Sequence, residues 1–291
     1  MHKKRDWTLS LAFPCTVIKD VAGQDMKSYI CGQIGRALAV FNVNEVIVYD
    51  PNNKTQGFAE NEGKSHTSCD LSFIVHILQY IECPQYLRKY LFPMHEDLKY
   101  IGLVNPLDVP HHLRRNEVSE YREGVVVSVS NSVSFVDIGC QKHAKVPMIL
   151  PEKTRVTLKL DAQAKGNYVG HPVDPAEPRL KNSYWGFDVR AATSLSEVFT
   201  NSPFGSYDQI IGFSKVGDRV TKINVSNSQH LLLFIDINGE LLDQLKLDAD
   251  LQLESPKAIF SEFVNPLINL KNSSEVTIDE YLFSVLSKLR L

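Results

Sequence analysis

Two short and nearly uninterrupted apolar runs constrain the fold of this chain more than any other feature. They span residues 45–50 and 230–235, and they are rich in valine, isoleucine and leucine. Strands of this kind are buried on both faces, as in parallel sheets covered by helices. Apolar residues at helical spacing predict helices over 25–41 and 70–81. We therefore expect an α/β fold with right-handed connections, in which 230–235 is a central strand.

Shorter signals complete this α/β pattern. Strands are expected at 8–13, 186–190 and 208–214, and a short helix is expected from Pro84 to Leu91. Ser194 to Glu197 and Thr277 to Glu280 have the spacing of capping boxes, so each predicts the start of a helix. The polar stretch 51–64 is expected to be a mobile loop.

The helical period disappears between Tyr121 and Trp185. Short strands separated by turns and prolines are expected there, at 124–129, 132–138, 145–146 and 155–160. This length and strand count fit a small β-barrel of the OB type. We therefore predict an N-terminal α/β part at 1–118, a barrel insertion at 119–185 and a C-terminal α/β part at 186–291.

Charge is unevenly distributed along the chain. The 31 Lys and Arg residues nearly balance 34 Asp and Glu residues, which excludes a uniformly basic nucleic-acid-binding protein. Residues 141–190, however, hold nine basic and five acidic side chains, whereas 236–291 hold five basic and ten acidic. An ordinary solvated surface is one explanation of these charges, but a basic barrel with aromatic side chains nearby is what single-stranded nucleic acid needs.

Cysteine spacing and hydropathy restrict the redox compartment of the protein and its relation to membranes. The five cysteines form no CxxC pair, which favours a reducing, intracellular compartment and argues against a structural metal site. No run of 18 apolar residues is present, so we expect no membrane span. Dinucleotide-binding, P-loop, nucleophile-elbow and zinc-protease signatures are all absent.

Five other segments are candidates for chemistry. In 32–37, two glycines within a predicted helix precede Arg36, which is either a surface arginine or a fixed cation facing an anion. Residues 102–115 are expected to follow a strand as a rigid loop, and their polar side chains also suit phosphate or bases. Adjacent histidines on a strand point to opposite faces, so a metal site there is disfavoured. Loops at 212–218, 234–240 and 265–274 are expected at the carboxyl ends of strands, where open α/β sheets bind their ligands. The alternative is that these three loops only connect secondary-structure elements.

Several longer stretches carry a resemblance to a known family. They are YICGQIGRA at 29–37, LQYIECPQYLRK at 78–89, NPLDVPHHLR at 105–114, YREGVV at 121–126 and YWGFDVR at 184–190. With these stretches the chain resembles the SPOUT superfamily of RNA methyltransferases, in the branch that carries an OB-fold insertion. The resemblance covers nearly the whole chain, from Thr8 to the last predicted helix.

This resemblance implies an α/β fold whose C-terminal part is threaded into a trefoil knot, in a homodimer that methylates RNA with S-adenosylmethionine. A uridine-like base nitrogen is the expected target. Arg36, Asn105 and Asp108 become the candidate catalytic residues. The cofactor is expected to contact Gly212, Ser214, Gly217, Phe234, Gly239, Asn265 and Ser273. RNA is expected to contact His111, His112, Arg114, Arg115, Lys142 and Lys145.

The resemblance also leaves other functions open. Animal members of the branch are associated with the centromere and the mitotic spindle, which implies a nuclear location and spindle or centromere proteins as partners. In the family the loop after the central strand carries adjacent glycines, whereas here Phe234 is followed by Ile235 and Asp236, and the first glycine is Gly239. One alternative is therefore a catalytically weakened scaffold that binds RNA or spindle components. Another is a plain RNA-binding module at 121–185.

Overall fold

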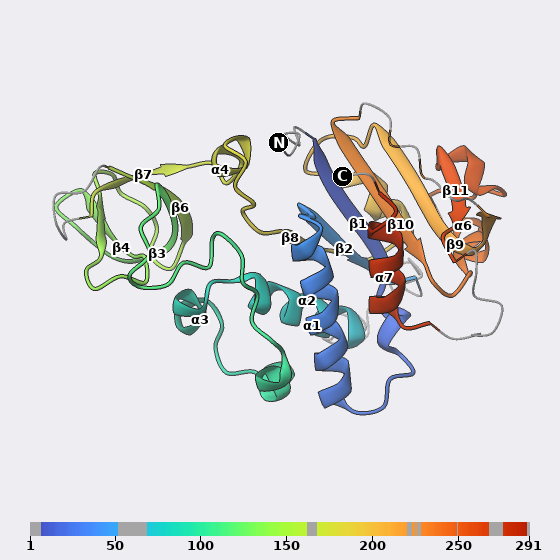
Figure 1. The fold of residues 1–291 in the computed structure, drawn as a ribbon, viewed down its shortest axis with the longest axis horizontal. Coiled ribbons are helices and arrows are strands. Elements are labelled where there is room, and N and C mark those ends of the chain that lie inside the picture. The colour runs from blue at the N-terminus through green and yellow to red at the C-terminus, as the bar shows by residue number, and fades with distance from the viewer. Residues whose placement is uncertain are drawn as a thin grey trace, which may run out of the picture. The chain divides into compact units, whose positions relative to one another are not determined.

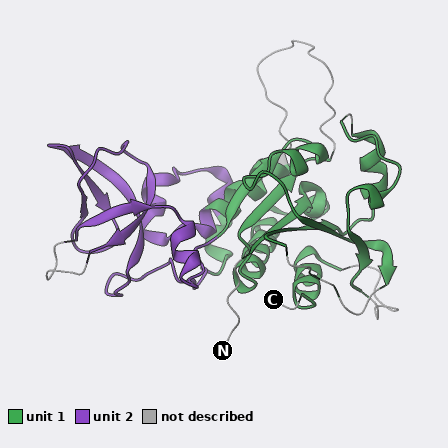
Figure 2. Cartoon of the chain, turned by 90° about the horizontal axis from the view of Figure 1, so that it is seen from above, with its two compact units in different colours: residues 1–79, 100–105, 187–291 green, residues 80–99, 106–186 purple. Residues whose placement is uncertain are grey.

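The computed structural model describes residues 7–51, 69–161, 168–219, 223, 225, 228–248, 250–267 and 276–289. The chain forms two compact units, coloured separately in Figure 2. Unit 1 comprises 1–79, 100–105 and 187–291, and unit 2 comprises 80–99 and 106–186. Unit 2 therefore starts earlier in the chain than residue 119, where we expected the barrel insertion to begin.

Unit 1 is built on a six-stranded sheet in which every pairing is parallel. The strand order is β11-β9-β10-β1-β2-β8. Their bounds are β1 (Thr8–Pro14), β2 (Glu45–Tyr49), β8 (Asp188–Ala192), β9 (Gln209–Arg219), β10 (His230–Asp236) and β11 (Glu262–Asn265). The apolar run at 230–235 therefore lies inside the sheet, between β9 and β1, as predicted.

Helices cover this sheet, and all of them except α6 lie where periodicity or a capping box predicts a helix. They are α1 (Gln24–Val40), α2 (Cys69–Glu82), α5 (Leu195–Thr200), α6 (Leu241–Leu247) and α7 (Ile278–Leu286), with short 3₁₀ turns η1 (Cys15–Ile18) and η3 (Pro256–Ala258). Helices α1 and α7 lie side by side (Figure 1), and the rings of Phe41 and Phe283 meet edge to face. The capping box at Thr277 is confirmed, because both of its reciprocal bonds form.

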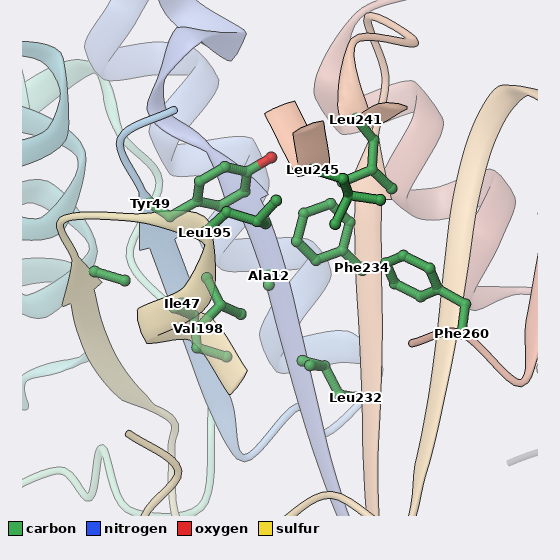
Figure 3. Packing of buried hydrophobic residues seen from close by; sticks show 11 residues of the cluster. Ala12, Ile47, Tyr49, Leu195, Val198, Leu232, Phe234, Leu241, Leu245 and Phe260 are labelled. Atoms are coloured by element: carbon green, nitrogen blue, oxygen red, sulfur yellow. The ribbon is translucent and has the colours of Figure 1, made fainter. Parts of the chain in front are cut away.

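An apolar cluster fills the space between the sheet and helices α5 and α6 (Figure 3). The ring of Phe234 from β10 lies 5.3 Å from that of Tyr49 at the end of β2 and 5.6 Å from that of Phe260. Leu241 and Leu245 of α6 belong to the same cluster. Burying such side chains contributes about 2 kcal/mol each, so this cluster holds the carboxyl ends of the strands rigidly.

Unit 2 contains a five-stranded antiparallel sheet of order β5-β4-β3-β6-β7. Its strands are β3 (Tyr121–Ser130), β4 (Val133–Asp137), β5 (Ala144–Val146), β6 (Arg155–Leu160) and β7 (Gly170–Val173). A bridge between Lys145 and Val169 joins the two edges, so the sheet is curled around its own apolar core. Strand β7 was not expected, because it contains Gly170 and Pro172, which both disfavour strands.

The helix expected from Pro84 to Leu91 is confirmed, whereas two further elements differ from the sequence-based expectations. Helix α3 (Gln85–Leu91) packs Leu87 against Val125 of the curled sheet, which explains why unit 2 includes residues before 119. The segment before Asn105 is a 3₁₀ helix, η2 (Glu96–Leu103), where we expected a strand. A short helix, α4 (Ala176–Leu180), lies within the segment expected to hold only strands.

The predicted loop at 212–218 is part of the long strand β9, because β11 pairs with it as far as Arg219. The predicted mobile loop at 51–64 lies outside the described residues except for Pro51. Within the described part of the chain, no helix has both the length and the apolar character that crossing a bilayer requires.

Candidate functional site

Asp236 ends the central strand of unit 1 and organises the carboxyl edge of the sheet. It is in register with Ser214 of β9, whose hydroxyl donates a 2.7 Å hydrogen bond to Oδ2 of Asp236. Oδ1 of Asp236 accepts the backbone N–H groups of Gly239 at 2.9 Å and Glu240 at 3.0 Å. Burial raises the pKa of Asp236 above its ordinary value despite these bonds. The carboxyl group therefore holds the turn after β10 in one conformation.

Two buried tyrosines lie near this carboxyl group. Tyr49 ends β2, and its hydroxyl donates to Oε1 of Gln244 at 2.9 Å. Tyr281 of α7 is fully buried, and among the described residues its hydroxyl has no hydrogen-bond partner. Burial, followed by the Asp236 carboxylate, raises the pKa of both phenols, so both stay protonated. The carboxyl edge thus combines a carboxyl group, an amide and an unsatisfied phenol.

The sequence indicates this edge but not its chemistry. Asp236 is a polar residue that directly follows the most apolar strand, which is the signal that places it at a strand end. Tyr49, Gln244 and Tyr281 were not predicted to belong to the site. Their sequence separation is large, and no local pattern links them.

The glycines expected to approach the cofactor contact the protein itself. A Cβ on Gly212 would lie 2.6 Å from the Phe263 ring, and one on Gly217 would lie 2.6 Å from the backbone of Val264. Both glycines therefore serve the close packing of β11 on β9, which corrects their placement in an open loop. Gly239 has a φ of +76°, so the turn after β10 requires its conformational freedom.

The remaining predicted cofactor residues have mixed surroundings. Phe234 is a buried core residue. The Nδ2 of Asn265 donates a 2.7 Å hydrogen bond to the carbonyl oxygen of Lys215 and so joins β11 to β9. Ser273 lies outside the described residues.

Arg36 and Asn105, both predicted catalytic residues, belong to unit 1 and are exposed. A Cβ on Gly32, one turn before Arg36 in α1, would lie 2.6 Å from Cγ1 of Val104. Val104 therefore occupies the space that the absent side chain leaves. The structure thereby brings together two motifs that are far apart in the sequence. Asp108 is exposed and belongs to unit 2.

His111 and His112 are held by one carbonyl group in unit 2. Their Nε2 atoms lie 3.1 Å and 2.6 Å from the carbonyl oxygen of Glu82. Burial, and then the neighbouring His111, lowers the pKa of His112 to about 4, so its ring is neutral. His111 is fully buried, so it does not offer its ring to solvent as expected for an RNA ligand. The two rings instead fix the 106–112 segment to the end of α2.

The same histidine pair is part of a larger polar network that the sequence did not reveal. Arg155 of β6 lies 2.6 Å from Oε2 of Glu82 and 2.7 Å from Oε2 of Glu123. Thr157 and Trp185 also donate to Glu123. Although burial opposes ionisation, the Arg155 guanidinium holds the pKa of Glu82 well below its usual range, with help from His111. Within unit 2, this network ties the segment that begins at Tyr80 to the curled sheet.

The other predicted RNA ligands are exposed side chains of unit 2: Arg114, Arg115, Lys142 and Lys145. Lys145 lies on β5 at the bridge that joins the two sheet edges. The N–H of Arg114 donates to Glu117, which fixes the backbone there and leaves the guanidinium at the surface.

Comparison with known proteins identifies the family. The model of a family described as "Putative RNA methyltransferase" matches residues 8–289. A 28S rRNA (uridine-N(3))-methyltransferase of Drosophila melanogaster is 38% identical over 97% of this chain, which spans 62% of that relative's length. The Homo sapiens protein of the same name is 39% identical over 90% of this chain and 72% of its own length. The chain therefore belongs to this RNA methyltransferase family.

Proposed function

We propose that this protein methylates N3 of a uridine in large-subunit ribosomal RNA, with S-adenosylmethionine as methyl donor. The observation that carries the proposal is the family match from residue 8 to residue 289, which includes both units of the structure. The fly and human relatives are named for this reaction on 28S rRNA. We also propose that the C-terminal strands form the family's trefoil knot and that the curled sheet of unit 2 is an OB-type barrel.

The carboxyl edge of the unit 1 sheet suits a cofactor with hydroxyl, amino and carboxylate groups. The buried Tyr281 hydroxyl has no partner among the described residues, and unsatisfied buried polar atoms are uncommon without a ligand or water. Asp236 and the turn to Gly239 would hold the cofactor's polar groups beside it. When bound, S-adenosylmethionine supplies an activated methyl group. The protein then has to bind the cofactor and the RNA, orient the target base toward the methyl group and keep water away.

The target base requires a cation close to its carbonyl oxygens. Uracil N3 becomes nucleophilic when it loses its proton, and the negative charge then spreads to O2 and O4. Arg36 is a permanent cation, and a cation near these oxygens lowers the pKa of N3. A base inside folded RNA must first leave its stack to reach Arg36. We propose that Asn105 assists Arg36, and that the exposed basic side chains of unit 2 hold the RNA backbone.

An exposed apolar stripe on α1 supports a homodimer. Met26 is 50% exposed, Tyr29 is 45% exposed and Val40 is 62% exposed. Spacings of three and eleven residues keep these three side chains on one side of the helix. Phe283 of the adjacent α7 is 38% exposed. We propose that a second copy of the chain covers this surface.

A second function is favoured by one observation. Atoms of β11 occupy the space beside Gly212 and Gly217. The adjacent glycines expected after Phe234 from the resemblance are replaced here by Ile235 and Asp236. A scaffold that binds RNA, or spindle and centromere proteins in the nucleus, has no need of an open cofactor cradle.

One experiment separates the two functions. The full chain is titrated with S-adenosylmethionine and S-adenosylhomocysteine by calorimetry, and then incubated with large-subunit rRNA and labelled cofactor. The methyltransferase predicts micromolar binding and one methylated uridine, which mass spectrometry of nuclease fragments locates, and Arg36→Ala should abolish the label. Absence of cofactor binding by the folded protein would favour the scaffold.

A further inference from the structure

The contact between Gly32 and Val104 has a steric consequence for α1. A methyl group at position 32 would lie 2.6 Å from Cγ1 and 3.1 Å from Cγ2 of Val104, closer than carbon atoms approach. Glycine within a helix costs roughly 1 kcal/mol relative to alanine. Glycine at position 32 is therefore explained by the space that it leaves for the Val104 side chain, and not by its effect on helix stability. We call this the Gly32 notch: the surface of α1 at Gly32 that receives the side chain of Val104.

The Gly32 notch also restricts where Asn105 lies. Its Cα is about 3.8 Å from that of Val104 along the chain. Arg36 lies one turn after Gly32, a rise of about 6 Å. Side chains on a helix lean toward its N-terminus, so the Arg36 side chain extends back over the turn that contains Gly32. Arg36 and Asn105 are both exposed, so one ligand at the surface can contact both.

The chemistry of the two side chains is complementary to an ionised uracil. Arg36 provides a fixed positive charge with several N–H donors, and the Asn105 amide provides two further neutral donors. A uracil ring that has lost its N3 proton presents two electron-rich carbonyl oxygens, one on each side of N3. One donor group for each oxygen would stabilise this anion and also orient N3 toward the methyl donor.

We propose that Val104 is a positioning residue, and that its insertion into the Gly32 notch places the Asn105 amide opposite Arg36 to bind the carbonyl oxygens of the target uracil. This inference rests on the proposed function, because it assigns the recognition of the base to that site. It adds a specificity determinant, since cytosine has an amino group in place of one of these oxygens and would lose one of the two contacts.

The test compares alanine substitutions at two glycines. Gly32→Ala introduces the clash with Val104, whereas Gly102→Ala is a matched control because no atom lies within 4 Å of its added Cβ. Single-turnover methylation should fall about a hundredfold for Gly32→Ala, as for a misplaced reacting group, with unchanged cofactor affinity. The double variant Gly32→Ala/Val104→Ala removes the clash, and its methylation rate should be at least tenfold higher than that of Gly32→Ala. Asn105→Ala should lower the methylation rate by the same factor as Gly32→Ala.

A second measurement separates this inference from the proposed function. RNA that carries 4-thiouridine is photocrosslinked to the full chain, and the crosslinked peptides are mapped. Crosslinks to 104–105 that disappear in Gly32→Ala and return in the double variant would support the inference, even in a protein without methylation activity. Equal methylation and equal crosslinking in Gly32→Ala and Gly102→Ala would overturn it. An inactive wild-type protein with no uridine crosslink would instead refute the proposed function.

Discussion

The hydroxyl of Ser214 donates a 2.7 Å hydrogen bond to Oδ2 of Asp236, and this contact joins the two neighbouring strands β9 and β10. The other oxygen of Asp236 accepts two backbone N–H groups of the following turn. One side chain therefore links the sheet to the segment that we propose contacts the cofactor. Because Asp236 is buried, the charge on its carboxylate is costly while its hydrogen bonds are favourable.

These opposing effects predict different results for two substitutions of Asp236. Asp236→Ala leaves the N–H groups of Gly239 and Glu240 without acceptors, and it should lower the free energy of unfolding by about 1–3 kcal/mol. Asp236→Asn keeps an acceptor for both N–H groups and removes the buried charge, so it should change stability by less than about 1 kcal/mol. Urea unfolding at neutral pH checks both values. Equal destabilisation by the two substitutions would show that the charge itself is required.

The strands and helices of unit 1 were predictable because burial on both faces produces a local signal. The run at 230–235 became an interior strand, and the capping box at Thr277 forms as expected. Local patterns do not show which segments meet. Gly212 and Gly217 look like loop glycines in the sequence, but β11 packs so closely that a side chain at either position would clash. The need for glycine at these two positions comes from tertiary packing, so the periodicity of the sequence does not reveal it.

For the candidate site, the sequence likewise indicated individual residues but not the contacts between their segments. Arg36 and Asn105 are exposed in unit 1, and their two segments meet where Gly32 approaches Val104, a contact that no spacing rule reports. The prediction for the histidine pair was less accurate, because polar residues in a loop suggest a surface. His111 is buried by its pairing with Glu82, a residue 29 positions away in the sequence.

The Glu82 carboxylate should make the stability of unit 2 depend on pH. Arg155 and His111 hold its pKa below the unfolded value, so the stabilisation is present above about pH 4.5 and is lost as the pH falls below that value. Glu82→Gln leaves Arg155 with one carboxylate partner and should cost about 3 kcal/mol at neutral pH. The difference between the wild type and Glu82→Gln should shrink in acid. Denaturant unfolding checks this, with the exposed Glu152→Gln as control.

Lys142 and Lys145 should contribute to RNA affinity through phosphate contacts. Both are exposed in unit 2, and each phosphate contact releases about one counterion on binding. Replacing both by alanine should weaken binding of rRNA fragments and reduce the salt dependence of the binding constant by about two counterions. Filter binding over a range of salt concentrations measures both quantities. Lys257→Ala, an exposed lysine of unit 1, serves as control, and an equal effect of that variant would argue against an RNA surface on unit 2.

The apolar stripe on α1 should be the surface that joins two copies of the chain. Tyr29 and Val40 are 45% and 62% exposed, and Phe283 from α7 extends the apolar surface beside them. Removing such side chains from water favours association, whereas a buried unpaired charge opposes it strongly. Tyr29→Glu combined with Val40→Glu should therefore convert a dimer into a monomer without unfolding it, because neither side chain is in the core.

Sedimentation equilibrium of the full chain measures this change directly. Val118→Glu is the matched control, since Val118 is 84% exposed and belongs to unit 2. The control should remain a dimer, with an unchanged circular dichroism spectrum in all variants. A wild-type chain that sediments as a monomer at every concentration, or a double variant that still dimerises, would show that α1 does not form the interface. If the dimer completes the cofactor site, the monomeric variant should also lose cofactor affinity, which calorimetry with S-adenosylhomocysteine would detect.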